Sequence, residues 1–250
     1  MRSSDGTTIA YEQAGTGPVL ILVGGALNNR HSTASLVPLL EKSFTVLSYD
    51  RRGRGDSTDT PPYAVEREVE DLHAVAAATE GPVHVYGHSS GAILSLEAAA
   101  AGLPLKKMAV YEPPYLTTGG EDWQDFVEKI ASLAGTGHGG SAVEEFIRHT
   151  GADFDPAMMQ SPWWPELVSL APTLPYDLIL TGDGGVPADR LADIAAPVLA
   201  LYGGASADWA AASAIAVASA VQHGLTNAID GQDHAVASAA IAPILLEFFH

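Results

Sequence analysis

A five-residue segment, Gly87-His88-Ser89-Ser90-Gly91, constrains the fold of this chain more than any other feature. It follows the short apolar run 83–86 and precedes a helical pattern at 92–100 that is rich in alanine and leucine. A strand that passes into a helix through so few residues makes a sharp turn, and the two glycines let the strand and helix backbones pass close together. We therefore expect Ser89 to take strained dihedral angles and to expose its hydroxyl above the N-terminus of the helix, which can stabilise a developing anion.

Apolar runs alternate with helical patterns along much of the chain, which predicts an α/β fold: a mostly parallel twisted sheet with helices on both faces. We expect strands at 7–12, 19–23, 44–49, 83–86, 108–111, 198–202 and 225–229. A helix with one apolar stripe should start at Val65. Its acidic residues Glu66, Glu68, Glu70 and Asp71 are interpreted as a solvated first turn.

The pattern changes between residues 116 and 190, where prolines and glycines recur and strand-like runs are scarce. Helical periodicity is present at 123–133 and 142–150. We expect a core made of residues 1–115 and 191–250, with 116–190 as a helical insertion between two strands of the sheet.

Composition excludes several classes of function. The 250 residues include no cysteine, which rules out disulfides, thiolate zinc sites and cysteine nucleophiles. The net charge of −18 should repel nucleic acid and anionic membrane surfaces. The one basic cluster is Arg51-Arg52-Arg54. Residues 1–6 hold no apolar signal region and no run is long enough to span a bilayer, so we expect a cytoplasmic protein. The expected partner is a small-molecule substrate. The oligomeric state does not follow from the sequence.

No cofactor or metal is expected either. Residues 135–140 match Gly-x-Gly-x-x-Gly, but they follow a helical stretch and not a strand, so we interpret them as a linker. His84 and His88 are four residues apart on a strand and a turn, which is not the arrangement of a metal pair on one helix face.

A serine nucleophile needs a base, and histidine, whose unperturbed pKa lies near 6.5, is suited to that role. The chain has nine histidines. Two of them, His234 and the terminal His250, lie after the last predicted strand, and only His234 is in the loop Gly231-Gln232-Asp233-His234 that leads to the final helix.

Together these segments resemble the α/β-hydrolase family. The elbow Gly87–Gly91 matches its Gly-x-Ser-x-Gly motif, and Asp50–Ser57 is similar to its Asp-x-Arg-Gly-x-Gly-x-Ser turn. The resemblance implies Ser89 as nucleophile and His234 as base, with the backbone amides of Ala26 and Ser90 forming the oxyanion hole. The family's usual histidine, which braces the oxyanion loop, is replaced by Gly24.

The resemblance also makes the insertion a cap over the substrate pocket. We expect the pocket to be lined by residues of the oxyanion loop and by aromatic residues from the cap side: Gly25, Leu27, Tyr115, Trp163 and Trp164. Such a lining would favour an apolar substrate. Packing in the core of the cap is the open alternative for the aromatic residues.

The acid of the triad is the open question. Family members usually carry it after the strand that follows the cap, and Ser206 stands there instead. Asp208 lies two residues further on but could simply cap a helix. Glu112 ends the strand after the elbow helix, where some family members carry their acid, and we prefer it because carboxylates at the carboxyl ends of strands face the site in such sheets. Asp177 and Asp183 are more remote choices.

The sequence therefore predicts a cofactor-independent serine hydrolase that cleaves an ester or related acyl bond. Two alternatives remain open. The same site could serve a lyase, C–C hydrolase or isomerase that uses Ser89 and His234 for proton transfer, or the chain could be a non-catalytic ligand-binding protein.

Overall fold

The computed structural model describes residues 1–115, 121–150 and 154–250. Seven strands form one sheet in the order β1-β3-β2-β4-β5-β6-β7, parallel throughout except for β1, which runs antiparallel to β3. Their bounds are β1 Tyr11–Ala14, β2 Val19–Val23, β3 Thr45–Tyr49, β4 Val83–His88, β5 Leu105–Tyr111, β6 Val198–Gly203 and β7 Gly224–Ile229. The mostly parallel sheet predicted from the alternating pattern is confirmed.

The first strand begins later than predicted. Residues 7–9 pair instead with residues 1–3 across a turn at 4–6: Ser3 N–H donates to the Thr7 carbonyl at 2.8 Å, and Arg2 forms an antiparallel bridge with Thr8. The ladder to β3 therefore starts only at Tyr11, which pairs with Tyr49.

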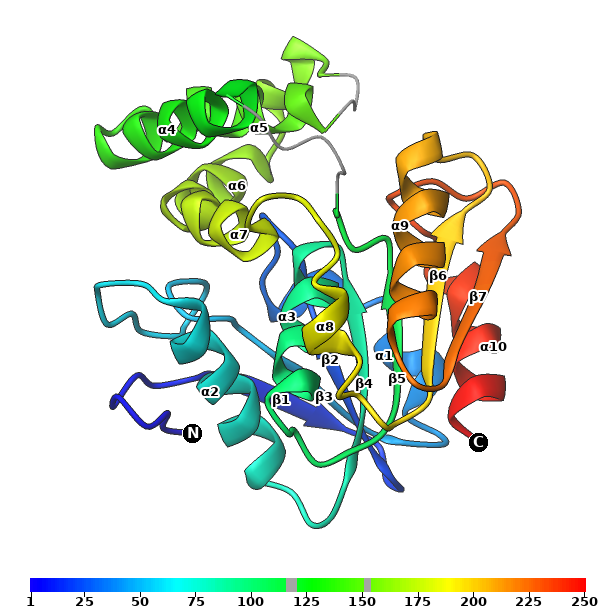
Figure 1. Ribbon diagram of the computed structural model, residues 1–250. Coiled ribbons are helices and arrows are strands. Elements are labelled where there is room, and N and C mark those ends of the chain that lie inside the picture. Colours follow the sequence, from blue (N-terminus) through cyan, green and yellow to red (C-terminus); the bar gives the residue numbers. More distant parts are fainter. Residues whose placement is uncertain (116–120, 151–153) are drawn as a thin grey trace.

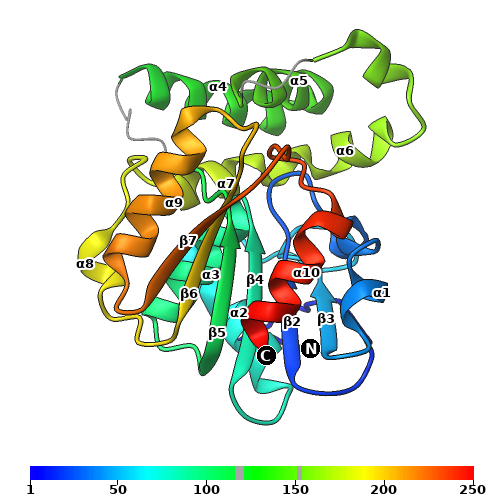
Figure 2. The same ribbon diagram turned by 90° about the vertical axis from the view of Figure 1, so that its right-hand side faces the viewer.

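Both faces of the sheet are covered because residues of the inner strands β2 to β6 alternate between two apolar clusters. Ile21 and Val23 of β2 point into the first cluster, whereas Leu20 and Leu22 point into the second. The first cluster includes residues from four helices: α2 (Val65–Ala77), α3 (Ser90–Ala100), α8 (Ala188–Leu191) and α9 (Asp208–Ala220). The second cluster includes residues from two others, α1 (Val37–Leu40) and α10 (Ser238–Phe249). Figure 2 shows α10 in front of the sheet, with α2 and α3 behind it.

Between β5 and β6 the chain forms a further helical layer. It comprises α4 (Glu121–Gly135), α5 (Gly139–His149), α6 (Trp164–Leu170) and α7 (Leu174–Thr181), with short 3-10 turns at Pro156–Gln160 and Ala171–Thr173; another such turn, Arg30–Thr33, follows β2. Figure 1 shows this layer above one end of the sheet. It has its own apolar cluster, centred on residues such as Phe126, Ile130 and Leu174, against which Ala26 and Leu27 pack.

The layer therefore covers the loop that follows β2. Its expected start at residue 116 lies outside the described residues, and α8 contacts α3 and α9 of the core. The division at 115/116 and 190/191 thus stays a prediction. Within the described ranges, no helix combines the length and apolarity needed to cross a membrane.

Candidate active site

The turn between β4 and α3 has the geometry expected from its glycines. Ser89 lies at its apex with φ 55° and ψ −127°, a region that residues with side chains rarely occupy. A Cβ on Gly87 would lie 2.7 Å from the Ala92 Cα, and one on Gly91 would lie 2.4 Å from the Val23 carbonyl oxygen. Only glycine fits at either position, so the sharp strand–turn–helix predicted from the sequence is present.

Glu112 and His234 form a direct pair. His234 Nδ1 lies 2.7 Å from Glu112 Oε2, and the Glu112 side chain is fully buried. The carboxylate also accepts hydrogen bonds at Oε1 from the Gly203 amide at 2.8 Å and from the Ser206 hydroxyl at 2.5 Å. Burial opposes ionisation of Glu112, but these three hydrogen bonds outweigh it and hold its pKa below the ordinary value. An ionised Glu112 requires the proton of a neutral His234 ring to be on Nδ1, which leaves Nε2 able to accept one.

Ser206, at the usual position of the acid, thus donates a hydrogen bond to the carboxylate that comes from the neighbouring strand. Asp208 is exposed and is the first residue of α9. Among the residues that the structure describes, no hydrogen bond or ion pair joins Asp208 to His234. The geometry favours Glu112 over Asp208 as the partner of His234.

The loop that carries His234 is anchored from two strands. The Tyr111 hydroxyl donates to the Asp233 carbonyl at 2.5 Å, and His88 Nε2 donates to the His234 carbonyl at 2.8 Å. The rings of His88 and His234 lie 4.9 Å apart between centroids. Burial and the nearby His234 lower the pKa of His88 to about 4, so His88 is neutral and holds its proton on Nε2.

His234 lies beside the elbow, since His88 directly precedes Ser89. In the described part of the chain, no hydrogen bond joins the Ser89 hydroxyl to His234. Such bonds are often long before substrate binds and tighten in the complex, so this geometry does not argue against the pair. The structure thus forms the histidine–acid contact, and the described contacts include no hydrogen bond between Ser89 and His234.

The loop after β2 lies against the elbow. A Cβ on Gly25 would lie 2.8 Å from the Ser89 Cβ and 3.4 Å from its Oγ, so only glycine allows this approach. Leu27 has φ 56°, and within the ranges that the structure describes the three non-glycine residues of positive φ are Leu27, Ser89 and Glu112, all of them at this site. No hydrogen bond to another described residue uses the Ala26 or Ser90 amide. Both amides are therefore available to a ligand.

Comparison with known proteins agrees with this geometry. The Alpha/beta hydrolase family matches residues 19–242, which is most of the chain. The chain belongs to the alpha/beta hydrolase family. It is thus an enzyme of that family, and the resemblance found in the sequence is confirmed.

Three relatives of this alpha/beta hydrolase are informative. An alpha/beta hydrolase from Sphaerobacter thermophilus, known from a crystal structure, has 46% sequence identity to this chain. The two structures superpose with a TM-score of 0.91 over 100% of this chain and 99% of the other. The (E)-2-((N-methylformamido)methylene)succinate hydrolase of Acinetobacter baylyi is 26% identical over 94% of this chain and 90% of its own length. The uncharacterized hydrolase YraK of Bacillus subtilis is 34% identical, but the match spans 37% of this chain and about a third (35%) of YraK.

The predicted pocket residues separate into two groups. Gly25 and Leu27 lie in the loop beside Ser89, and their place in a substrate pocket stays a prediction. Trp164 packs inside the apolar cluster of the helical layer, with its ring 5.9 Å from that of Phe154, and Trp163 is 43% exposed. Neither tryptophan forms a hydrogen bond or a ring contact with Ser89 or His234 among the described residues.

Tyr115 also differs from the expectation. It is only 3% exposed and belongs to the first core cluster, together with residues of α3 and α8. The chain turns tightly at Pro113-Pro114, where Tyr115 N–H donates to the Pro113 carbonyl at 2.8 Å. Directly after this turn, the Tyr115 side chain lies in the core.

The basic cluster of the sequence is not a surface feature of this alpha/beta hydrolase. Arg51, Arg52 and Arg54 are at most 2% exposed. Arg51 pairs with Glu68, and Arg52 pairs with Asp71, through two hydrogen bonds each. The interpretation of Glu68 and Asp71 as solvated residues is therefore wrong: both are fully buried, because each compensates a buried guanidinium.

Sequence reasoning also missed the position of Asp177. This residue of α7 was a remote candidate for the triad acid, but its carboxylate accepts hydrogen bonds from Arg51, Arg54 and the Ser90 hydroxyl. It is 2% exposed. Nothing in the sequence indicated a carboxylate here, because the burial of Arg51 and Arg54, which requires paired carboxylates, is visible only in the structure.

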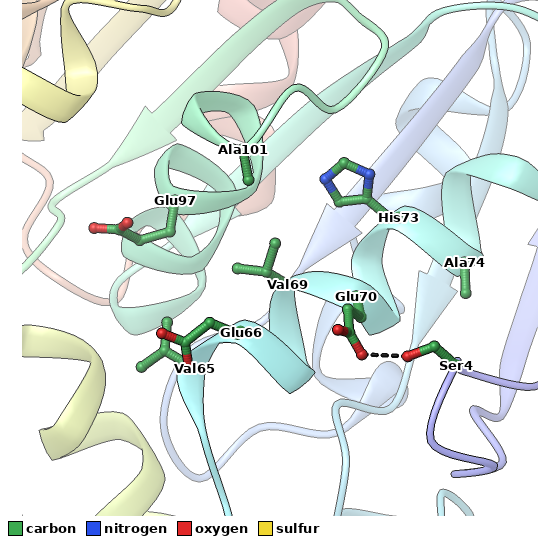
Figure 3. A pocket seen from close by; sticks show the side chains of 9 residues that line it. All are labelled: Ser4, Val65, Glu66, Val69, Glu70, His73, Ala74, Glu97 and Ala101. Atoms are coloured by element: carbon green, nitrogen blue, oxygen red, sulfur yellow. Dashed lines mark hydrogen bonds between the residues drawn. The ribbon is translucent and has the colours of Figure 1, made fainter.

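The cavity whose lining side chains are drawn in Figure 3 lies away from this site. It is a groove of about 530 Å³ between α2 and α3, lined in part by Val65, Val69, His73 and Glu97, and it contains neither Ser89 nor His234. Within the ranges that the structure describes, no group of three or more histidine, aspartate or glutamate side chains is arranged to hold a metal ion.

Proposed function

We propose that this alpha/beta hydrolase is a serine hydrolase that cleaves an ester or related acyl bond of a small, apolar substrate without a cofactor. The observation that carries the proposal is the 2.7 Å contact between His234 Nδ1 and the buried Glu112 carboxylate, next to a strained serine. A buried acid that orients an imidazole beside a serine hydroxyl is the arrangement that activates serine.

The reaction follows from these positions. Ser89 Oγ attacks the carbonyl carbon while His234 Nε2 takes its proton, and the carbonyl electron pair moves onto oxygen. The Ala26 and Ser90 amides would bind that oxyanion. Glu112 stabilises the imidazolium that forms. When the intermediate collapses, the leaving alkoxide takes the proton from His234. Water then repeats these steps on the acyl-enzyme and releases the acid.

The substrate class rests on what surrounds the loop beside Ser89. Ala26 and Leu27 pack against the apolar cluster of the helical layer, and that layer covers this loop. Apolar walls with a few polar anchors favour a small hydrophobic acyl or alcohol group. Chromogenic 4-nitrophenyl esters of increasing chain length would find which of them fits.

Fluorophosphonate labelling tests the proposal. We expect one covalent adduct, located on Ser89 by mass spectrometry, absent in Ser89→Ala and much slower in His234→Gln. The exposed His223 provides the matched control, since His223→Gln should label like the wild-type enzyme. A wild-type protein that is not labelled and does not hydrolyse esters would contradict the proposal and would favour proton-transfer chemistry or ligand binding without catalysis.

A further inference from the structure

A buried guanidinium holds the peptide group that lies beside Ser89. Arg54 Nη1 donates to the Gly25 carbonyl at 2.6 Å, and the Arg54 side chain is fully buried. In a trans peptide the carbonyl of one residue and the N–H of the next point in opposite directions within one plane. With the Gly25 carbonyl directed at Arg54, the Ala26 N–H is directed away from Arg54. The closeness of Gly25 to Ser89 places this peptide group next to the nucleophile.

Arg54 is itself held from the helical layer. Its Nη2 lies 2.8 Å from Asp177 Oδ1 and 2.9 Å from Oδ2. Asp177 Oδ1 also accepts a hydrogen bond from the Ser90 hydroxyl at 2.6 Å. The Asp177 carboxylate on α7 is thus linked to both proposed oxyanion donors. It contacts Ser90 through the Ser90 hydroxyl, and it is linked to Ala26 through Arg54 and the Gly25 carbonyl.

A second guanidinium completes the arrangement. Arg51 Nη1 lies 2.8 Å from Asp177 Oδ1, 3.1 Å from the Ser90 hydroxyl and 3.4 Å from the Gly24 carbonyl. Burial opposes ionisation of Asp177, but Arg54 and Arg51 outweigh it and hold its pKa below the ordinary value. Asp177 is therefore an anion at neutral pH, and its bonds to the guanidinium groups are charge-assisted.

We propose that Arg54, held by Asp177, is a positioning residue that orients the Ala26 amide in the oxyanion hole, and that Asp177 positions Ser90 in the same way. This inference rests on the proposed serine hydrolase function. Arg54 would do here what the missing histidine at position 24 does in other family members, with the difference that its support comes from the cap side. The position of α7 on the core then determines whether the Ala26 and Ser90 amides point at the reacting oxygen.

The test compares Arg54→Met with Arg52→Met. Arg52 is as buried as Arg54 and also donates two hydrogen bonds to one carboxylate, that of Asp71. It makes no hydrogen bond to residues 24–27 among the residues that the structure describes. The end-point of fluorophosphonate labelling counts the folded, competent sites in each variant, so that kcat is expressed per site. The substrate is 4-nitrophenyl butyrate.

We expect Arg54→Met to lower kcat per labelled site by about 10- to 100-fold, with KM changed by less than about twofold, because a misaligned oxyanion donor weakens only the transition state. Arg52→Met should lower the Tm but leave kcat per site within about twofold of wild type. Arg54→Lys, which keeps the charge but not the planar fork, should restore part of the loss.

A trifluoromethyl ketone gives the second readout. Ser89 Oγ adds to its carbonyl, the carbonyl pair becomes an oxyanion in the hole and the proton passes to His234. Its affinity should fall in Arg54→Met by the same factor as kcat, whereas the affinity of the matching alcohol, which forms no oxyanion, should stay unchanged. If Arg54→Met does not fold, Ser90→Ala, which removes one hydroxyl, should still lower both values by about threefold or more.

The outcomes are distinct. Unchanged kcat per site and unchanged ketone affinity in Arg54→Met, or in Ser90→Ala where Arg54→Met does not fold, would overturn the inference and leave the hydrolase proposal intact. Equal losses in Arg52→Met would also overturn it, because the effect would then be structural. A wild-type protein with neither labelling nor esterase activity would overturn both.

Discussion

Replacing Glu112 by glutamine changes one atom and tests the triad directly. The glutamine oxygen can keep the hydrogen bonds from the Gly203 amide and the Ser206 hydroxyl, which both use Oε1. The new amide group then replaces Oε2 and presents a donor to His234 Nδ1. To accept from that donor, His234 must carry its proton on Nε2, and this tautomer cannot take the proton of Ser89.

The expected magnitude follows from that tautomer. In a Ser-His-Asp triad, an amide in place of the orienting acid lowers kcat by about 10⁴-fold while the geometry stays intact. This corresponds to about 5 kcal/mol of lost transition-state stabilisation. Glu112→Gln should therefore lower kcat for 4-nitrophenyl butyrate by about three to four orders of magnitude, with KM little changed.

The matched control is Asp208→Asn, which makes the same carboxylate-to-amide change at an exposed residue. Its kcat should stay within about twofold of wild type. The assay is steady-state hydrolysis at saturating ester, with the fraction of competent sites counted by fluorophosphonate. If Asp208→Asn loses activity to the same extent, or if Glu112→Gln keeps more than about a tenth of wild-type kcat, the assignment of Glu112 is refuted.

Three further predictions follow from the contacts of the site. Gly25→Ala should abolish labelling of Ser89 while the circular dichroism spectrum is kept, because the added Cβ would lie 2.8 Å from the Ser89 Cβ. Ser206→Ala should lower kcat by about three- to tenfold, since it removes one hydrogen bond that stabilises ionised Glu112; an unchanged rate would show that this bond is dispensable. The pKa of Asp177 is held below its ordinary value of 3.8, so its ion pairs contribute fully above that pH and are lost as the pH falls through the lower folded-state pKa. Thermal melts of the wild type and Asp177→Asn should therefore differ at neutral pH and converge in strong acid.

The sequence was sufficient for features that depend on neighbouring residues. Runs of apolar residues located the strands, and the glycines around Ser89 located the sharp turn, because each of these signals lies within one short stretch of sequence. Glu112 could be proposed because its place at the end of a strand fixes the edge of the sheet at which it lies.

Features that depend on distant residues could not be read in this way. The pairing of Arg51 with Glu68 and Asp177 joins residues 17 and 126 positions apart. A run of acidic residues at the start of a helix is ordinarily solvated, so nothing local marked Glu68 and Asp71 as buried. Likewise, no local pattern showed that Tyr115 would turn into the core or that Asp177 would reach the elbow.

The position of the acid has a consequence for recognising related proteins. With Glu112 at the end of β5 and Ser206 at the end of β6, a search that demands an aspartate after the penultimate strand would discard this chain as an inactive homologue. Homologues that combine a glutamate before Pro-Pro with a serine after β6 would be read in the same way as lacking a third catalytic member, whereas the proposed triad takes that member from one strand earlier.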